Sequence, residues 1–388
     1  MAVISLLSLP KEIFSQNVGI GTTTPLARLH VTDSSVLFSA VNNVPVTAVN
    51  PPLEGPGRRM MWYPDKAAFR VGYVTNNEWD KNNIGTYSFA SGWRSIASGV
   101  GSVALGYGAS ASGDYSIALG NSRAAGIYSA APGGNGYAAG DYSFASGYLT
   151  TASGYNSTAM GYLTSASGNL STALGGYSVA SGYNSTAMGY TTTASGSYST
   201  TIGNYVSTTG FNGAFALGDN STTTVMQSFV ANGFRSRFAG GYRLLTNSAA
   251  TLGVVLLPDG GSWSAISDVR LKENFLPVNA ENILKKIASL PLTTWNYTEQ
   301  SRKTSRHYGP MAQDFYKAFG HDELGVIGCD TLINQQDFLG VNLIAIQALE
   351  KRTQKITLLE KESAELRKQN EALLKRIERL ETLLTSKK

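Results

Sequence analysis

The sequence predicts a mainly β protein: a left-handed parallel β-roll, then a small α/β domain and a C-terminal parallel coiled coil. Three observations predict this fold class. A glycine falls on every seventh residue from Gly85 to Gly210, with one residue missing between Gly120 and Gly126. Helix-type apolar spacing first appears after residue 266, and a heptad pattern fills the C-terminal end. A short fixed period over so many residues is typical of a solenoid rather than a flexible linker.

The true repeat is fourteen residues, because the two seven-residue halves differ. From Ser153 onward the residue before each glycine alternates between Ser and a larger apolar residue, as at Met160 and Leu174. Each half is predicted to be a short strand closed by a turn, where glycine supplies a positive φ or a close approach. Two strands make one coil, and coils stacked at about 4.8 Å give a roll roughly 40 Å long.

Small residues dominate each predicted coil. Alanine stands two positions before nearly every periodic glycine, as at Ala90, Ala97 and Ala104. In a strand this alanine column and the neighbouring Ser, Leu or Met column face opposite sides. At about 25 cal/mol per Å² of buried apolar area, so thin a coil would have a weak core of its own. We therefore expect an oligomer that packs through the small-residue face, with three chains around one axis.

The repeats resemble the head repeats of trimeric adhesins of the YadA type, whose units read like NSxAxG. Residues 156–161 and 184–189 both read NSTAMG, and residues 115–120 read YSIALG. The resemblance covers about a third of the chain. It implies a left-handed β-roll in a homotrimer, and it implies no ligand.

Composition narrows the classes of partner. The chain has 388 residues and a net charge of +5, but residues 343–388 alone carry +4, so the basic balance describes a tail. With few charges in the roll, we expect no nucleic-acid partner. A single Cys329 and three scattered histidines, His30, His307 and His321, predict no disulfide, metal site or cofactor. No apolar stretch is long enough to predict a membrane-spanning segment.

The segments outside the roll are predicted in outline. Residues 1–16 read as a leader or as a short β or amphipathic start, residues 17–84 as a β-rich capping domain, residues 85–218 as the roll, and residues 219–266 as a β connector. Residues 17–31, NVGIGTTTPLARLHV, resemble the opening of secreted or phage-fibre-like bacterial proteins. This resemblance favours an extracellular, cell-surface or virion location.

The candidate chemistry begins at residue 267. Taken alone, Ser267 reads as a helix N-cap and Lys272 as a solvated cation. However, SDVRLKEN (267–274), HYGPMAQDF (307–315) and GVNLIAIQAL (340–349) in this order resemble the endosialidase-type intramolecular chaperone domain. The resemblance implies a trimer-assembly domain that cuts itself off between Ile266 and Ser267, with Ser267 as nucleophile and Lys272 as general base. Two departures are Asp314, where the family has glutamate, and the irregular stretch 331–342.

The chemistry is also sound from first principles. Ser267 Oγ can attack the preceding carbonyl through a five-membered ring, giving an ester that water hydrolyses. A lysine near its reference pKa of ~10.4 is protonated at neutral pH, so it must be desolvated to act as a base. Ser–Lys pairs are a known variant of the serine triad.

Geometry restricts how this pair could meet. An i, i+5 pair on one helix is splayed by about 140°, so contact requires either a bend at Ser267 or neighbouring chains of a trimer. Asp268, His307 and Gln313 are candidate supporting residues, with a helix cap, a surface histidine and a buried amide as their ordinary alternatives.

Residues 343–388 are predicted to form a parallel coiled coil, and a lone amphipathic helix is the alternative. Its d positions are Leu359, Leu366, Leu373 and Leu380, and its a positions are Ile356, Ser363, Asn370, Ile377 and Leu384. Polar a residues fix register at a cost in stability. Ile at a with Leu at d slightly favours two strands, whereas the family resemblances favour three.

Together these features predict a homotrimeric fibre or adhesin-like surface protein, facing a host-surface or glycan receptor. Its C-terminal domain, residues 267–342, would align three chains and then sever itself. The alternative is an uncleaved trimeric binding module with an ice- or glycan-binding ladder at Thr158, Thr172, Thr186 and Thr200. A hydrolase acting on other molecules is disfavoured, because the roll sequence has neither paired carboxylates nor a nucleophile–histidine set.

Overall fold

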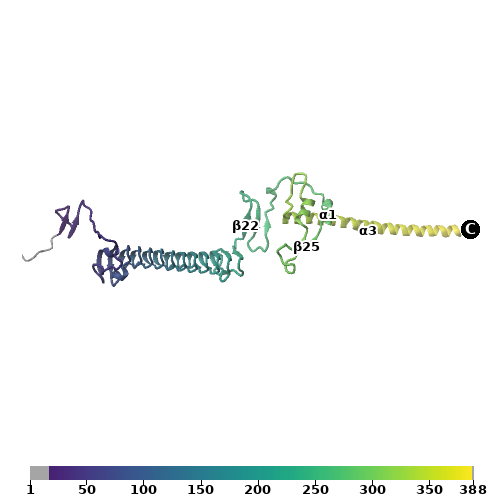
Figure 1. The fold of residues 1–388 in the computed structure, drawn as a ribbon. Helices are drawn as coiled ribbons and strands as arrows, with labels where there is room; N and C mark the ends of the chain where they lie inside the picture. Colours follow the sequence, from purple (N-terminus) through teal and green to yellow (C-terminus); the bar gives the residue numbers. More distant parts are fainter. Residues whose placement is uncertain (1–16, 387–388) are drawn as a thin grey trace, which may run out of the picture. The chain divides into compact units, whose positions relative to one another are not determined.

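The computed structural model describes residues 17–386 and divides into two compact units between Gly240 and Gly241. The predicted leader, residues 1–16, lies outside the described residues. The first unit holds a solenoid of parallel β coils, and the second holds a few helices, including one long C-terminal helix (Figure 1). The predicted fold class of a β-roll followed by helices is confirmed. Its handedness and the number of chains stay predictions.

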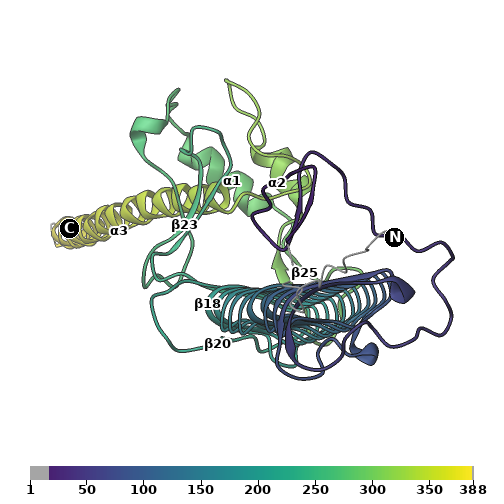
Figure 2. The same cartoon turned by 90° about the vertical axis from the view of Figure 1, so that its left-hand side faces the viewer.

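Most coils of the roll pair with the next at a register of fourteen residues, but β9 and β10 pair at thirteen, and the last coils pair at fifteen and nineteen. Phe144 lies beside Thr158, and Ala152 beside Ala166 (Figure 2). The longer strands are β5 (Phe89–Trp93), β7 (Val103–Tyr107), β9 (Ile117–Ala124), β10 (Ala130–Ala138), β11 (Phe144–Tyr148), β13 (Thr158–Tyr162), β15 (Thr172–Gly176), β17 (Thr186–Ala194) and β18 (Thr200–Ser207). The short strands are β6 (Ile96–Ala97), β8 (Ser110–Ala111), β12 (Thr151–Ala152), β14 (Ser165–Ala166) and β16 (Val179–Ala180).

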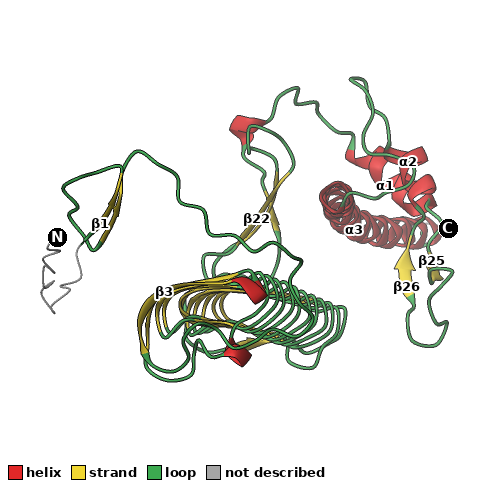
Figure 3. Cartoon of the chain, turned by 60° about the vertical axis from the view of Figure 1, so that its left-hand side comes forward, coloured by secondary structure: helices red, strands yellow, loops and turns green. Residues whose placement is uncertain are grey.

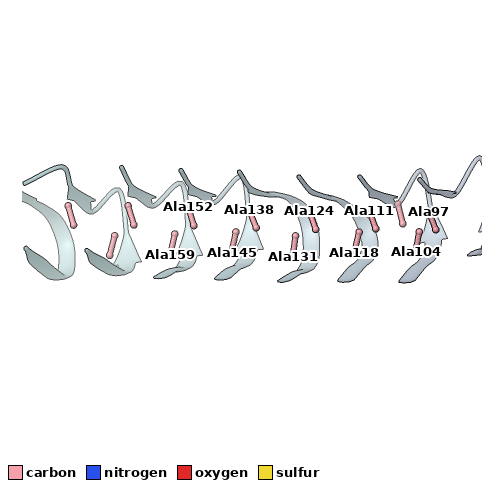
Figure 4. Close-up of a cluster of buried hydrophobic side chains, with 14 of the residues drawn as sticks. Ala97, Ala104, Ala111, Ala118, Ala124, Ala131, Ala138, Ala145, Ala152 and Ala159 are labelled. Carbon is pink, nitrogen blue, oxygen red and sulfur yellow. The ribbon is translucent and has the colours of Figure 1, made fainter. Parts of the chain in front are cut away.

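The alanine column lies inside the roll, so the prediction that this face joins the chains is wrong. Ala97, Ala104 and the equivalent alanines through Ala194 are fully buried within one chain. Figure 4 shows alanines from the two halves of each coil pointing toward one another. Only small side chains fit between the opposite walls of so narrow a coil. Any contact between chains must therefore use the outward-facing columns.

The periodic glycines permit coils to stack closely. A Cβ on Gly154 would stand 2.0 Å from the carbonyl oxygen of Gly168, although Gly154 has an ordinary φ. Gly161 has the same close contact together with a φ of 125°. The left-handed turn positions are instead occupied by residues such as Asn156 (φ 51°) and Leu163 (φ 54°). Close approach is thus the shared role of these glycines, and other residues make the turns.

Polar groups also help to fix the coils. Ser102, fully buried, donates from Oγ to the carbonyl oxygen of Gly99 at 2.7 Å. At the edge of the roll, Asp114 Oδ1 accepts the backbone N–H of Val100, one coil earlier, at 2.8 Å. A charged residue of the roll thus has a structural role between coils.

The N-terminal end of the roll is closed by a hairpin and a buried arginine. Its elements are β3 (Gly57–Tyr63), η1 (Pro64–Lys66), β4 (Ala68–Val74) and η2 (Lys81–Asn83), and β4 pairs in parallel with β5. The fully buried Arg70 donates to both oxygens of Ser88 and to Ala97 O at 2.7–3.0 Å. Burial lowers the pKa of Arg70 to about 10. Buried Trp79 donates to Ser95 O at 2.8 Å, so both halves of the first coil are covered.

Residues 17–31 form a separate small element. Its strands β1 (Val18–Ile20) and β2 (Leu29–Val31) pair in parallel, with Gly19 beside His30.

The roll continues beyond Gly218, where the sequence placed its end. Strand β19 (Phe215–Gly218) ends at that residue, and the additional strands are β20 (Met226–Gln227) and β21 (Phe234–Arg237), of which β21 pairs in parallel with β19. Asp219 holds this end together by accepting the Ala239 N–H at 2.7 Å and the Arg237 Nε–H at 3.3 Å. The Ala239 and Ser221 hydrogen bonds lower the pKa of Asp219 to about 2. The loops at this end of the roll break the seven-residue spacing, so the glycine period did not reveal the additional strands.

The second unit begins with a three-stranded antiparallel sheet and continues with helices (Figure 3). Its elements are β22 (Tyr242–Leu245), β23 (Gly253–Leu256), β24 (Ser264–Ala265), η3 (Val269–Leu271), α1 (Ala280–Ser289), β25 (Thr293–Trp295), β26 (His307–Gly309), α2 (Ala312–Phe319) and α3 (Gln335–Thr385). Helix α1 lies where the sequence predicts helix-type apolar spacing, after residue 266. Helix α3 starts earlier than the predicted coiled coil and includes the second part of the stretch 331–342.

The three helices of this unit are tied together by few contacts. Lys286 of α1 donates from Nζ to Ala318 O of α2 at 2.6 Å. Arg352 of α3 pairs with Glu281 of α1 at 2.5 Å. On α3, Ala348 is buried. Their packing fixes the first turns of α3 against α1.

Candidate functional site

The structure brings Ser267 and Lys272 together. Lys272 Nζ donates to Ser267 Oγ at 2.6 Å. The peptide bond before Ser267 follows directly on β24, and the N–H of Ile266 donates to Gly253 O at 3.2 Å. A candidate nucleophile, a candidate base and a backbone segment held at the end of a sheet therefore lie in one short stretch.

A bend explains how residues five apart can touch. Ser267 lies before the 3-10 turn η3, and Lys272 ends that turn in an extended conformation, with φ −127° and ψ 147°. Of the two geometries that the sequence allowed, the bend is therefore the one that operates within a single chain. Contact between neighbouring chains is not required for the two side chains to meet.

Asp268 shapes this bend rather than contacting the lysine. Its Oδ1 accepts the Arg270 N–H at 2.9 Å, which caps η3, and its carboxylate pairs with the Arg270 guanidinium at 2.5 Å. These hydrogen bonds from Arg270 lower the pKa of Asp268. The sequence analysis did not single out Arg270 or Gly253, although Arg270 lies within the quoted SDVRLKEN motif.

The pair is open to water in a single chain. Both Ser267 and Lys272 are exposed. A lysine amine in water keeps its proton, and only removal from water favours the neutral form that could act as a base. One protomer supplies the geometry of the pair but not its desolvation.

The other predicted supporting residues lie elsewhere. His307, in β26, stacks on Trp295 at 4.6 Å and contacts Gln300 Oε1 through Nε2 at 3.2 Å. Gln313 is exposed in the first turn of α2, which corrects its alternative reading as a buried amide. Within the described residues, neither His307 nor Gln313 is hydrogen-bonded to Ser267 or Lys272.

The long strands of the roll present two outward columns, one on each side of the buried alanine. Coil by coil the pairs are Phe89 with Ser91, Val103 with Leu105, Ile117 with Leu119, Phe144 with Ser146, Thr158 with Met160, Thr172 with Leu174, Thr186 with Met188 and Thr200 with Ile202. We call these columns the paired face. Apolar members such as Met160 stay 42% exposed in one chain.

Side-chain volume is complementary in several coils of the paired face. It is not in others, because Val103 with Leu105 and Ile117 with Leu119 are both large, and Ala130 with Pro132 are both small. Where the first column has a phenylalanine, as at Phe89 and Phe144, the second has a serine. Where the first has a threonine, as at Thr158, the second has a larger apolar residue. Side chains that face only solvent can have any total volume, whereas side chains in a packed contact must together fill the available space. The predicted threonine ladder belongs to this face, in register but beside apolar residues.

Helix α3 exposes the apolar positions of its heptads. Leu359, Leu366, Leu373 and Leu380 are 53–60% exposed. In a single helix this seam has no cover, and coiled-coil pairing is the usual way to bury it.

Two family models match separate parts of the chain. Residues 97–122, 138–164, 152–178 and 180–205 match the YadA head domain repeat. Residues 267–322 match the S74 peptidase family, described as the chaperone of endosialidase. A search of curated proteins found no match. The two predicted resemblances are thereby confirmed for these segments.

These matches define the class of protein. Head repeats of the YadA type together with an endosialidase chaperone domain support a trimeric adhesin or fibre protein with a C-terminal chaperone domain. Heads of this type imply a homotrimer and suggest a surface or extracellular location. Of the helices that the structure describes, none has the length and apolar content needed to cross a bilayer.

Proposed function

We propose that this chain is a homotrimeric surface or virion fibre protein whose C-terminal module drives assembly and then cleaves the chain between Ile266 and Ser267. The 2.6 Å contact between Lys272 Nζ and Ser267 Oγ carries the cleavage part of the proposal. It stands at the first residue of the segment matched to the chaperone family.

The reaction uses only groups of this chain and one water. Neutral Lys272 takes the proton from Ser267 Oγ, and the oxygen attacks the carbonyl carbon of Ile266. The bond from that carbon to the Ser267 nitrogen breaks, and the nitrogen gains a proton. Water then hydrolyses the ester, leaving a carboxylate at Ile266 and a free amine and hydroxyl at Ser267.

Assembly and cleavage are coupled through desolvation. In one protomer Lys272 is exposed to water. Covering this turn by a neighbouring chain would favour the neutral amine, so the reaction would start only after the chains have met. Premature cleavage of unassembled chains is thereby avoided.

The paired face of the roll is the proposed contact between chains. It exposes apolar side chains such as Met160 in one protomer, and burying them against a neighbouring chain would be favourable. The exposed seam of α3 would hold the chains in register during assembly. Once α3 leaves with the cleaved module, the roll contact keeps the three chains together.

A matched pair of proteins tests the proposal. The natural chain and its Ser267→Ala variant are expressed side by side, and their intact masses are measured. We expect fragments ending at Ile266 and starting at Ser267 from the natural chain only, with both proteins trimeric. Intact chain in both samples would leave an uncleaved trimerisation domain, the alternative function.

A further inference from the structure

An exposed column of tyrosine rings runs along one edge of the roll. Its members are Tyr148, Tyr162, Tyr177, Tyr190 and Tyr205, one from each of five successive coils. Neighbouring ring centroids lie 5.4–5.8 Å apart, and the first four rings are 44–48% exposed. We call this column the tyrosine ladder.

The sequence keeps a ring in every coil of the ladder even where the usual position lacks one. Gly176 stands in register between Tyr162 and Tyr190, and there the next residue, Tyr177, supplies the ring. Asn204 is likewise followed by Tyr205, whose ring contacts that of Tyr190.

The turn that supplies these two rings has a conformational cost. Tyr177 and Tyr205 both occupy the left-handed region, at φ 53° and 51°. Glycine or asparagine would fit there more easily. The equivalent residues of the neighbouring coils, Leu149, Leu163 and Thr191, have φ values of 53–54°, so this turn has the same cost with or without a ring. What is particular to residues 177 and 205 is that they supply the ring that positions 176 and 204 lack.

Three of the four ring-to-ring contacts in the ladder are edge-on, and only Tyr148 and Tyr162 are stacked, at 11°. Rings 162, 177, 190 and 205 are turned by 70–80° relative to their neighbours. In a stacked column, such as Tyr115, Tyr128 and Tyr142 with interplanar angles of 10–14°, the rings cover one another's faces and offer mainly edges. The two columns therefore differ in what they offer to a ligand.

The surroundings of the ladder are uncharged. From residue 142 to residue 218 the sequence has no Asp, Glu, Lys, Arg or His. Single-stranded nucleic acid also stacks on aromatic rings, but it requires cations along its backbone. Proline-rich helices dock into grooves lined by aromatic residues, whereas these rings stand in single file. The ligand that fits is neutral, extended, and made of units with an apolar face and a hydroxyl rim.

We propose that the tyrosine ladder binds a neutral polysaccharide lying along the roll, with sugar-ring faces on the tyrosine faces and sugar hydroxyls beside the phenol groups. This places the glycan site at the edge of the roll and not on the threonine ladder, which belongs to the paired face. The site is formed by one chain, so it does not depend on cleavage or assembly.

Binding is tested by depletion from solution, with insoluble cellulose and chitin as the neutral probes. Alginate serves as the polyanion probe and polyproline as the peptide probe. We expect the full chain to bind at least one neutral probe. The triple variant Tyr162→Ala, Tyr177→Ala, Tyr190→Ala should lose at least about tenfold in affinity, because aromatic stacking of this kind is worth such a factor per ring.

Two control variants localise the effect. Tyr→Phe at the same three positions keeps the rings and should retain most of the binding. Tyr115→Ala, Tyr128→Ala, Tyr142→Ala removes the stacked column and should leave binding unchanged. Equal losses in both alanine triples, no loss in the ladder triple, or binding only to alginate or polyproline would each overturn the proposal.

A measurement on the unaltered chain covers the case in which the variants fail to fold. Tyrosine nitration is mapped by mass spectrometry with and without soluble chitin or cellulose oligosaccharides. Protection of Tyr162, Tyr177 and Tyr190, but not of Tyr128, is expected. Uniform nitration in all samples, or no depletion by either neutral probe, contradicts the proposal. Trimer formation and cleavage are read independently, so their failure is distinguishable from failure here.

Discussion

Lys272 reaches back across a single 3-10 turn to donate a 2.6 Å hydrogen bond to Ser267, which lies two residues past the end of β24. The contact needs no second chain. In a single chain both side chains are exposed, so nothing shields the Lys272 amine from water. The Ser267–Lys272 contact and the removal of water from it are thus separate requirements for cleavage, and each can be tested alone.

Replacing Lys272 should stop cleavage without preventing assembly. In Lys272→Met the base is lost, and in Lys272→Arg a guanidinium that stays protonated replaces it. We expect intact trimers from both, measured by denaturing mass and by sedimentation. Lys285→Met, on α1, is the matched control and should cleave normally. Cleavage at the natural rate in Lys272→Met would eliminate the lysine as base.

Arg70 should hold the N-terminal end of the roll. Arg70→Ala leaves the oxygens of Ser88 and Ala97 buried without their donor, so we expect a loss of about 3 kcal/mol in the free energy of unfolding. Denaturant titration of the roll measures this loss. Arg58→Ala, at an exposed position of the same hairpin, should change stability by less than about 0.5 kcal/mol. Equal effects of the two substitutions would refute a capping role.

Coil stacking should tolerate no side chain at Gly154. A Cβ there meets the Gly168 carbonyl oxygen at 2.0 Å, and backbone cannot yield as a flexible side chain can. Gly154→Ala should cost about 4 kcal/mol or more in unfolding free energy. Leu163→Gly, at a left-handed turn with φ 54°, relieves strain and should cost far less. Comparable denaturation midpoints for the two variants would contradict the assigned roles.

Acid should loosen the C-terminal end of the roll through Asp219. Its folded pKa of about 2 lies below the ordinary value of 3.8, so the unfolded state binds more protons between these values. The stabilisation is present above about pH 4 and is lost as pH falls through about 2. The protection factor of the Ala239 amide in hydrogen exchange should fall over that window. In Asp219→Asn it should be lower throughout but independent of pH, and a flat profile for the natural chain would disprove the linkage.

Sequence alone predicted the roll because its constraints repeat. Glycines such as Gly154 permit close stacking in every coil, and alanines such as Ala97 fill the narrow interior in every coil. The same residue types therefore recur at a fixed spacing, and the repeat can be recognised from the sequence alone. The sequence could not say which column faces inward, since alternation defines two faces and alanine suits either. The end of the roll at Arg237 was missed because the last loops break the period.

The site was predictable in part. The order of motifs around Ser267 and Lys272 indicated the pair, but an i, i+5 spacing is compatible with a contact only once the bend at η3 is known. Arg270 could have been found, because its spacing of two from Asp268 suits a local ion pair. Gly253 could not, since its link to Ile266 depends on how three strands pair.

The central claim, that three chains assemble and then cut themselves before Ser267, is tested most directly by native mass spectrometry of the freshly purified natural chain. We predict a trimer of fragments ending at Ile266 and a separate species made of residues 267–388. A single intact chain that remains monomeric at micromolar concentration would contradict the claim.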